Sequence, residues 1–195
     1  MDFDVTVPTD LCHIMGNFDS NKGHSDILLS RHNYTTLYHH LFNRMRDQPV
    51  RLFELGLGTK SLLGWKEYFP KGQIYGADIG KPPFPSDGIT PFYCDQTSPE
   101  SITSLWKQLS EPFDIIIDSG LHTFSANVCF FKNSIHSLNA GGYYIVEDIS
   151  KADMPAFEEA IRVWKEEYPH TFTLVTLPSA VNTWDNSLLV VTADR

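Results

Sequence analysis

The stretch of sequence that decides the fold is VRLFELGLGTKSLLGWKEYFPKGQIYGADIG, residues 50–80. Its first part, 50–56, is a short apolar run that ends in glycine, which predicts a buried strand. Residues 60–69 have the spacing of a helix, and 72–80 return to a strand pattern. Strands that alternate with helices predict a parallel sheet covered by helices.

The same alternation continues toward the C-terminus. Further helices are predicted at 33–46, 98–109, 124–138 and 153–169, and further strands at 90–95, 113–120, 141–149, 170–177 and 186–193. The last two strands have no helix between them, so we expect an antiparallel hairpin. The predicted fold class is therefore α/β, a doubly wound, mostly parallel seven-stranded sheet with a reversed strand near the C-terminus. Residues 1–31 look irregular and predict an arm or cap, and 32–195 predict one domain.

The composition excludes several classes of protein. With 195 residues, 42% of them hydrophobic, the chain has the size and apolar content of one folded domain and is not disordered. Lys and Arg number 15 against 24 Asp and Glu, which argues against a nucleic-acid partner. Cys12, Cys94 and Cys129 form no CxxC pair, so we expect reduced thiols in a cytoplasmic protein. No signal peptide or membrane-spanning run is expected.

Ligands of doubly wound sheets bind beyond the carboxyl ends of the strands, so the residues there are the candidates. Gly56 and Gly58 follow the first strand and let the backbone approach a ligand. Glu54, just before this turn, suits a ligand with a positive amino group and would repel a pyrophosphate. This favours S-adenosylmethionine over NAD, although a helix-capping turn with a solvated Glu54 is the alternative.

The next two strand ends carry further polar residues. Asp78 lies 22 positions after Gly56, where an acid would hold a ribose diol. Asp95 and Gln96 follow the third strand and are placed to meet an adenine edge. Each of these acids also suits a turn or a helix start, and the three strand ends together favour a nucleotide site.

The fourth and fifth strands end in candidate catalytic residues. Asp118 and His122 follow the fourth strand, and Glu147 and Asp148 follow the fifth. Neighbouring carboxylates would make His122 more basic, so that it could take a proton from a hydroxyl group. The carboxylates could instead hold Mg²⁺. A structural hydrogen bond of His122 at a helix start is the alternative.

Several longer motifs resemble a known family. They are HNYTTLYHHLF (32–42), FELGLGTKSLLGWKEYFPKGQIYGADI (53–79), CDQ (94–96), FDIIIDSGLHT (113–123) and LNAGGYYIVEDI (138–149). Together they resemble class I S-adenosylmethionine-dependent methyltransferases, and most closely the antibiotic sugar O-methyltransferases of the macrocin and mycinamicin type. The resemblance implies a Rossmann-like methyltransferase fold and O-methylation of a small-molecule hydroxyl. It also implies His122 as the base, and Mg²⁺ held by an Asp of the fourth-strand motif with Glu147 and Asp148.

One position departs from that family. The pattern Asp-Asp-Gly-Ser-His reads Asp118-Ser119-Gly120-Leu121-His122 here, so Ser119 replaces an expected metal ligand. Loss of an anionic ligand weakens a hard-cation site. The metal is then absent, or Asp118 substitutes, or His122 works alone. Two rival functions stay open, a cofactor-binding module without turnover and a nicotinamide-dependent oxidoreductase. We expect residues 1–31 and 80–89 to face the acceptor, and a homodimer is possible.

Overall fold

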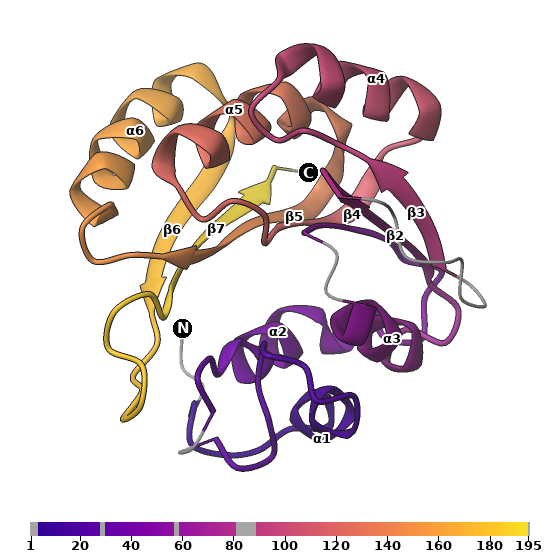
Figure 1. Cartoon of the computed structure of the whole chain (residues 1–195), viewed down its shortest axis with the longest axis vertical. Helices are drawn as coiled ribbons and strands as arrows, with labels where there is room; N and C mark the ends of the chain where they lie inside the picture. Colours follow the sequence, from indigo (N-terminus) through magenta and orange to yellow (C-terminus); the bar gives the residue numbers. More distant parts are fainter. Residues whose placement is uncertain (1–3, 28–29, 57–58, 81–88, 195) are drawn as a thin grey trace.

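A seven-stranded sheet forms the centre of the protein. The computed structural model describes residues 4–27, 30–56, 59–80 and 89–194. The strands lie in the order β3-β2-β1-β4-β5-β7-β6 (Figure 1). They are β1 Arg51–Leu55, β2 Gln73–Asp78, β3 Ile89–Tyr93, β4 Phe113–Asp118, β5 Leu138–Ile149, β6 His170–Thr176 and β7 Ser187–Ala193. Strand β7 is antiparallel to β5 and β6, whereas β1 to β5 pair in parallel, which confirms the predicted reversed strand.

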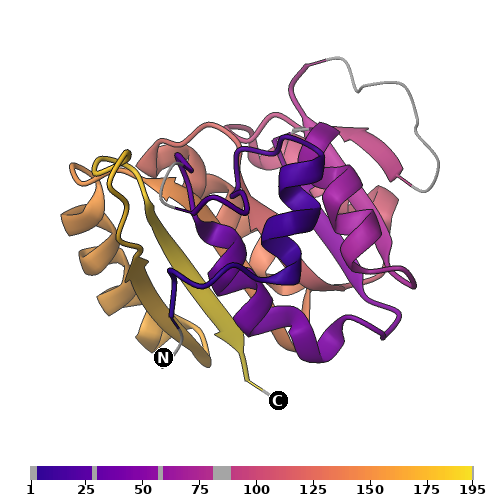
Figure 2. The ribbon, with the colours of Figure 1, turned by 90° about the horizontal axis from the view of Figure 1, so that it is seen from below.

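Helices cover both faces of this sheet. Figure 1 shows α1, α2 and α3 on one face and α4, α5 and α6 on the other, and in Figure 2 the first group lies in front of the sheet. The helices are α1 Asp10–Asn17, α2 Tyr34–Phe42, α3 Thr59–Tyr68, α4 Pro99–Leu109, α5 Phe124–Ser134 and α6 Met154–Glu167, with short 3-10 helices at Asn43–Met45 and Ile135–Ser137. Each face has its own hydrophobic core, so the carboxyl ends of the strands are held between two packed layers.

Local chemistry explains where some of these helices begin and end. Helix α4 starts where predicted, because the Ser98 hydroxyl accepts a hydrogen bond from the Ser101 N–H and Pro99 occupies the first turn. The helix predicted at 33–46 keeps its α-helical form only to Phe42 and then tightens into the 3-10 turn Asn43–Met45. Such a tightened last turn is common at helix ends.

The N-terminal segment differs from the irregular arm that the sequence predicts. Residues 10–17 form helix α1, which buries Leu11, Cys12, Ile14 and Met15. Helix α1 packs closely on α3, where a Cβ atom on Gly64 would lie 2.4 Å from the Met15 sulfur. An eight-residue helix has little stability of its own, so its apolar contacts with α2 and α3 decide its formation.

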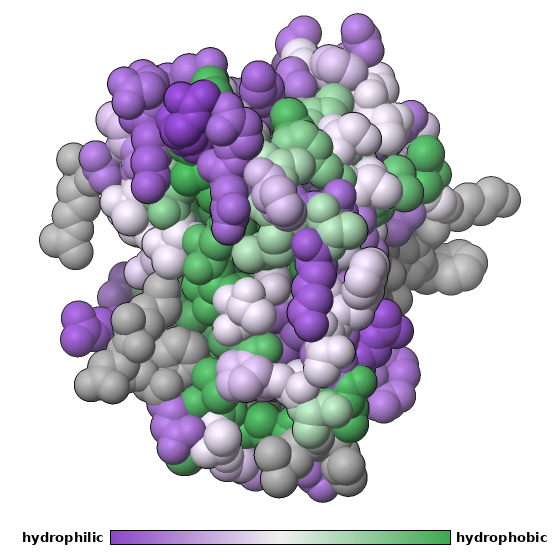
Figure 3. All heavy atoms as spheres, turned by 90° about the vertical axis from the view of Figure 1, so that its left-hand side faces the viewer, coloured by the Kyte–Doolittle hydropathy of each residue, from purple (hydrophilic) through white to green (hydrophobic). Residues whose placement is uncertain are grey.

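One side of the molecule carries both hydrophilic and hydrophobic side chains. Seen from the side in Figure 3, hydrophilic side chains gather at the upper left, and hydrophobic ones lie beneath them and toward the lower edge. Among the described residues, none of the helices combines the length and apolar character needed to cross a membrane.

Candidate active site

A pocket of about 350 Å³ opens at the carboxyl ends of β1, β2 and β4. Its volume lies in the range of small-molecule sites, roughly 300–1,000 Å³. Among the predicted residues, those that line it are Glu54, Gly56, Asp78, Asp95, Gln96 and His122. Gly58 lies outside the described residues, as does most of the predicted acceptor loop 80–89. The pocket therefore lies where the sequence predicts the ligand site.

The glycine turn after β1 passes directly against the turn after β4. Gly56 has a φ of 88°, and a Cβ atom there would lie 2.0 Å from the backbone oxygen of Ser119. Only glycine fits this position without a shift of one turn. The backbone of both turns can thus border the same part of the pocket.

Asp78 and Asp95 line the pocket, and each is also bonded to the backbone of its own turn. Oδ1 of Asp78 accepts from the Gly80 N–H at 2.8 Å. Oδ1 of Asp95 accepts from the hydroxyl and the N–H of Thr97, and these two bonds lower the pKa of Asp95. Both acids are therefore oriented by local hydrogen bonds.

Gln96, which lines the pocket, is hydrogen-bonded to the buried Asp118 behind it. The Gln96 amide donates to Asp118 at 2.8 Å and accepts from the Leu121 N–H at 2.7 Å, so both ends of the amide have partners. Asp118 is fully buried and also accepts from Asn127. Burial raises the pKa of Asp118 to about 6, against the opposing hydrogen bonds from Asn127 and Gly120. Asp118 does not line the pocket, and its contacts fix the turn that carries His122.

Glu54 also has internal partners. Its carboxylate accepts from the Ser61 hydroxyl at 2.5 Å and from the Trp65 indole N–H at 2.7 Å. The ammonium of Lys22 lies 3.4 Å away. Burial raises the pKa of Glu54, and the charge of Lys22 opposes that rise. At 1% exposure, Glu54 serves as a buried anchor at the pocket wall.

Glu147 is held by residues from the helical layer. Its Oε2 lies 2.5 Å from Nζ of Lys22, and its Oε1 accepts from the Tyr38 hydroxyl at 2.5 Å. Burial would raise the pKa of Glu147, but the Lys22 charge and hydrogen bonds from Lys22, Tyr38 and Ser119 outweigh it and lower the pKa. Glu147, Glu54 and Lys22 are below named the acid–lysine cluster.

Asp148 links His122 to buried aromatic residues. Its Oδ2 lies 3.4 Å from Nδ1 of His122, and its Oδ1 accepts from the Tyr34 hydroxyl at 2.8 Å and lies 3.2 Å from Nδ1 of His32. Burial and the charge of Glu147 raise the pKa of Asp148, and the two histidines oppose that rise. His122 is 45% exposed, so one side of its ring is oriented while the other stays accessible.

A break in the strand brings the two acids to one face. Consecutive residues of a regular strand point to opposite faces, yet Glu147 and Asp148 both contact tyrosines of α2. The pairing of β5 with β7 shifts register between Val146 and Ile149, and Asp148 has a left-handed φ of 55°. Bulges of this kind redirect side chains beside functional sites.

The arrangement does not fit a magnesium ion. Both oxygens of Glu147 are bonded to Lys22 and Tyr38, and Asp148 is engaged by Tyr34, His32 and His122. Ser119 brings no charge. Within the described ranges, no group of three His, Cys, Asp or Glu side chains is arranged to hold a metal. Glu147 and Asp148, predicted as metal ligands, are therefore placed together but bonded to protein groups.

Sequence reasoning missed four residues of this site. Lys22 lies in the presumed arm and carries no motif. His32 is 3% exposed and faces Asp148. Tyr34 and Tyr38 are buried and donate hydrogen bonds to Asp148 and Glu147. Their spacing of four residues on one helix face was the available signal.

The strand order with its reversed β7 is the fold of class I S-adenosylmethionine-dependent methyltransferases. The MycE methyltransferase of the mycinamycin pathway, solved with Mg and SAH, matches with a TM-score of 0.73 over 95% of this chain and 55% of its own, at 23% identity. An rRNA methylase from Streptococcus thermophilus matches with a TM-score of 0.57 and 11% identity, over 82% of this chain and 96% of its own.

Among sequences, the chain is homologous to antibiotic sugar O-methyltransferases, which confirms the resemblance in its motifs. A tetracenomycin rhamnoside 3'-O-methyltransferase from Streptomyces olivaceus is 36% identical over 65% of this chain and 34% of the relative. The mycinamicin VI 2''-O-methyltransferase from Micromonospora griseorubida is 34% identical over 65% and 34%. The chain thus spans about a third of these relatives' length. No protein-family model matches it.

Proposed function

We propose that the chain transfers a methyl group from S-adenosylmethionine to a hydroxyl oxygen of a glycosylated small molecule. The observation that carries this proposal is the pocket at the strand ends, lined by the glycine turn and by two oriented acids. The relatives' printed activities support the choice of a sugar hydroxyl. A cytoplasmic location and a homodimer belong to the same proposal.

In this proposal each part of the pocket contacts one part of the nucleotide. Asp78 would bind the ribose diol, and Asp95 would bind the adenine edge, with Gln96 shaping the adenine side through its bonds to Asp118 and Leu121. The turn at Gly56 would border the amino-acid portion. Glu54 and Lys22 offer both signs of charge to that portion, which itself carries an ammonium and a carboxylate.

The chemistry assigned to His122 is proton removal. S-adenosylmethionine, when bound, supplies an electrophilic methyl group. The acceptor oxygen forms a bond to the methyl carbon while the carbon–sulfur bond breaks and its electron pair stays on sulfur. The hydroxyl proton passes to Nε2 of His122, because Nδ1 faces Asp148 at 3.4 Å. Alignment of the two reactants would provide much of the rate.

Calorimetry and mass spectrometry test this function together. We expect binding heat with S-adenosylmethionine and S-adenosylhomocysteine but none with NAD. We also expect a methylated product with rhamnosylated tetracenomycin or mycinamicin VI as the acceptor. Binding heat without product from any glycosylated acceptor would favour the binding module, and heat with NAD alone would favour an oxidoreductase.

A further inference from the structure

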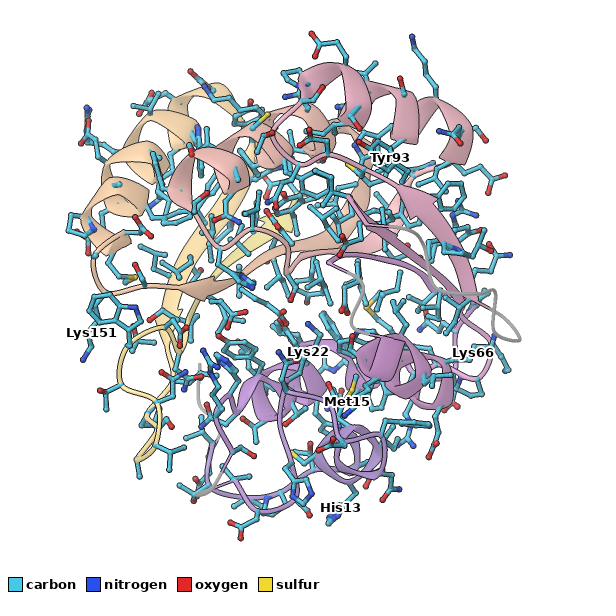
Figure 4. All side chains as sticks on the ribbon, in the orientation of Figure 1. His13, Met15, Lys22, Lys66, Tyr93 and Lys151 are labelled. Atoms are coloured by element: carbon cyan, nitrogen blue, oxygen red, sulfur yellow. The ribbon has the colours of Figure 1, made fainter. Side chains whose placement is uncertain are left out.

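The ammonium group of Lys22 is buried at the centre of the site. Lys22 lies between α1 and α2, is 2% exposed and is directed toward the sheet (Figure 4). Its Nζ atom lies 2.5 Å from Oε2 of Glu147 and 3.4 Å from Oε1 of Glu54. A fully buried lysine is rare unless it is paired, so the acid–lysine cluster acts as one charged unit.

The backbone beside Lys22 fixes this placement. The Lys22 carbonyl accepts from the Thr35 N–H at 3.3 Å, which ties the segment to α2. At the next residue, a Cβ atom on Gly23 would lie 2.2 Å from the Thr35 hydroxyl oxygen. The close approach of the Gly23 backbone to the Thr35 side chain requires glycine and sets where the lysine side chain enters.

The charges of the cluster depend on one another. Burial alone would lower the pKa of Lys22, but the charges of Glu147 and Glu54 outweigh it and raise the pKa. The lysine is thus paired with both carboxylates, at 2.5 Å from Glu147 and 3.4 Å from Glu54. Removing its charge would leave two buried carboxylates without a cation, which is strongly unfavourable.

We propose that the Lys22 ammonium is the resident cation of this cluster, and that the chain binds no divalent metal ion there. Magnesium needs about six oxygen ligands at roughly 2.0–2.1 Å. An ammonium 2.5 Å from Oε2 of Glu147 occupies the space that such an ion would need. The Tyr38 hydroxyl donates a hydrogen bond to the other carboxylate oxygen, Oε1. The neutral Ser119 donates to Glu147 and adds no negative charge to attract a second cation. This inference goes beyond methyl transfer, because it concerns how the cluster is neutralised.

Metal binding and thermal unfolding test the proposal without any methyl acceptor. The full chain is titrated with Mn²⁺ under electron paramagnetic resonance, and its Tm is measured with and without Mg²⁺. We expect no stoichiometric Mn²⁺ and no Mg²⁺-dependent rise in Tm. Lys22→Met should lower the Tm by roughly 6–20 °C, the change expected for a broken buried ion pair in a chain of this size.

Lys60→Met is the matched control. Lys60 also pairs with an acid of the N-terminal segment, Asp19, but it is 58% exposed. Its loss should change the Tm by no more than about 4 °C. If Lys22→Met does not fold, Lys22→Arg keeps the charge and should fold without acquiring Mn²⁺. Stoichiometric Mn²⁺ binding by the unmodified chain, or equal Tm values for Lys22→Met and Lys60→Met, would overturn the proposal. Both outcomes are independent of whether the chain methylates anything.

Discussion

The two sides of the carboxyl edge of the sheet are assembled in different ways. On the side proposed to bind the nucleotide, after β2 and β3, Asp78 and Asp95 are oriented by residues two positions away. On the side proposed to carry out the transfer, after β4 and β5, Glu147 is held by Lys22 and Tyr38, which lie 125 and 109 positions away. The first side depends on local turns and the second on the packing of the N-terminal layer, so substitutions on the two sides should have separable effects.

His122→Ala should show this separation most strongly. Loss of the proposed base is expected to lower turnover by about 10²–10⁴-fold, while the affinity for S-adenosylhomocysteine stays within about twofold, because the ring faces Asp148 and not Asp78 or Asp95. Single-turnover kinetics and calorimetry measure the two quantities. His136→Ala, an exposed histidine at the opposite end of the sheet, is the control. Unchanged turnover would remove His122 from the mechanism.

Asp118→Asn should change how stability depends on pH. The pKa of Asp118 is raised to about 6 by burial, so between pH 4 and 6 the folded chain binds more protons than the unfolded chain. The contribution of Asp118 to the free energy of unfolding is fully present below pH 4 and is lost as the pH rises through 6. The loss amounts to about 3 kcal/mol.

Urea unfolding from pH 4 to 7 measures this difference. We expect the free energy of unfolding to fall less with rising pH in Asp118→Asn than in the unmodified chain. Asp114→Asn, on the same strand but partly exposed, should keep the original pH dependence. Identical profiles for all three chains would show that Asp118 titrates normally.

Asp78→Asn addresses the nucleotide side. Loss of a charged acceptor for the ribose should weaken S-adenosylhomocysteine binding by about 10–100-fold, while turnover at saturation changes little. Asp47→Asn, exposed before β1, should leave the affinity unchanged. A loss of turnover with intact affinity would mean that the two sides are not separable.

Tyr34→Phe should have the smallest effect. It removes a hydroxyl that donates to Asp148 at 2.8 Å and to the Asp185 carbonyl at 3.0 Å. We expect a loss of about 1 kcal/mol in the free energy of unfolding and a turnover a few-fold lower, because Asp148 then holds His122 less firmly. Tyr75→Phe, whose hydroxyl contacts Arg51 and Gln73 away from the pocket, is the control. Equal turnover in the two variants would assign Tyr34 to stability alone.

The comparison also explains what the sequence could predict. Strands, most helices and the acids after β2 and β3 follow from local patterns, since periodicity and turn chemistry act over a few residues. Helix α1 could not be predicted, because its stability comes from contacts with α2 and α3. The partners of Glu147 and Asp148 were missed for the same reason, because they depend on packing between distant segments and on the bulge at Asp148.

The position of Lys22 matters for any attempt to cut this chain into shorter fragments. The predicted boundary between residues 31 and 32 would separate an N-terminal arm from the domain that contains the sheet. A fragment that starts at His32 would keep Glu54 and Glu147 but lose their shared counterion. Anyone who grafts, shortens or circularly permutes this scaffold should carry residues 10–24 along with the sheet.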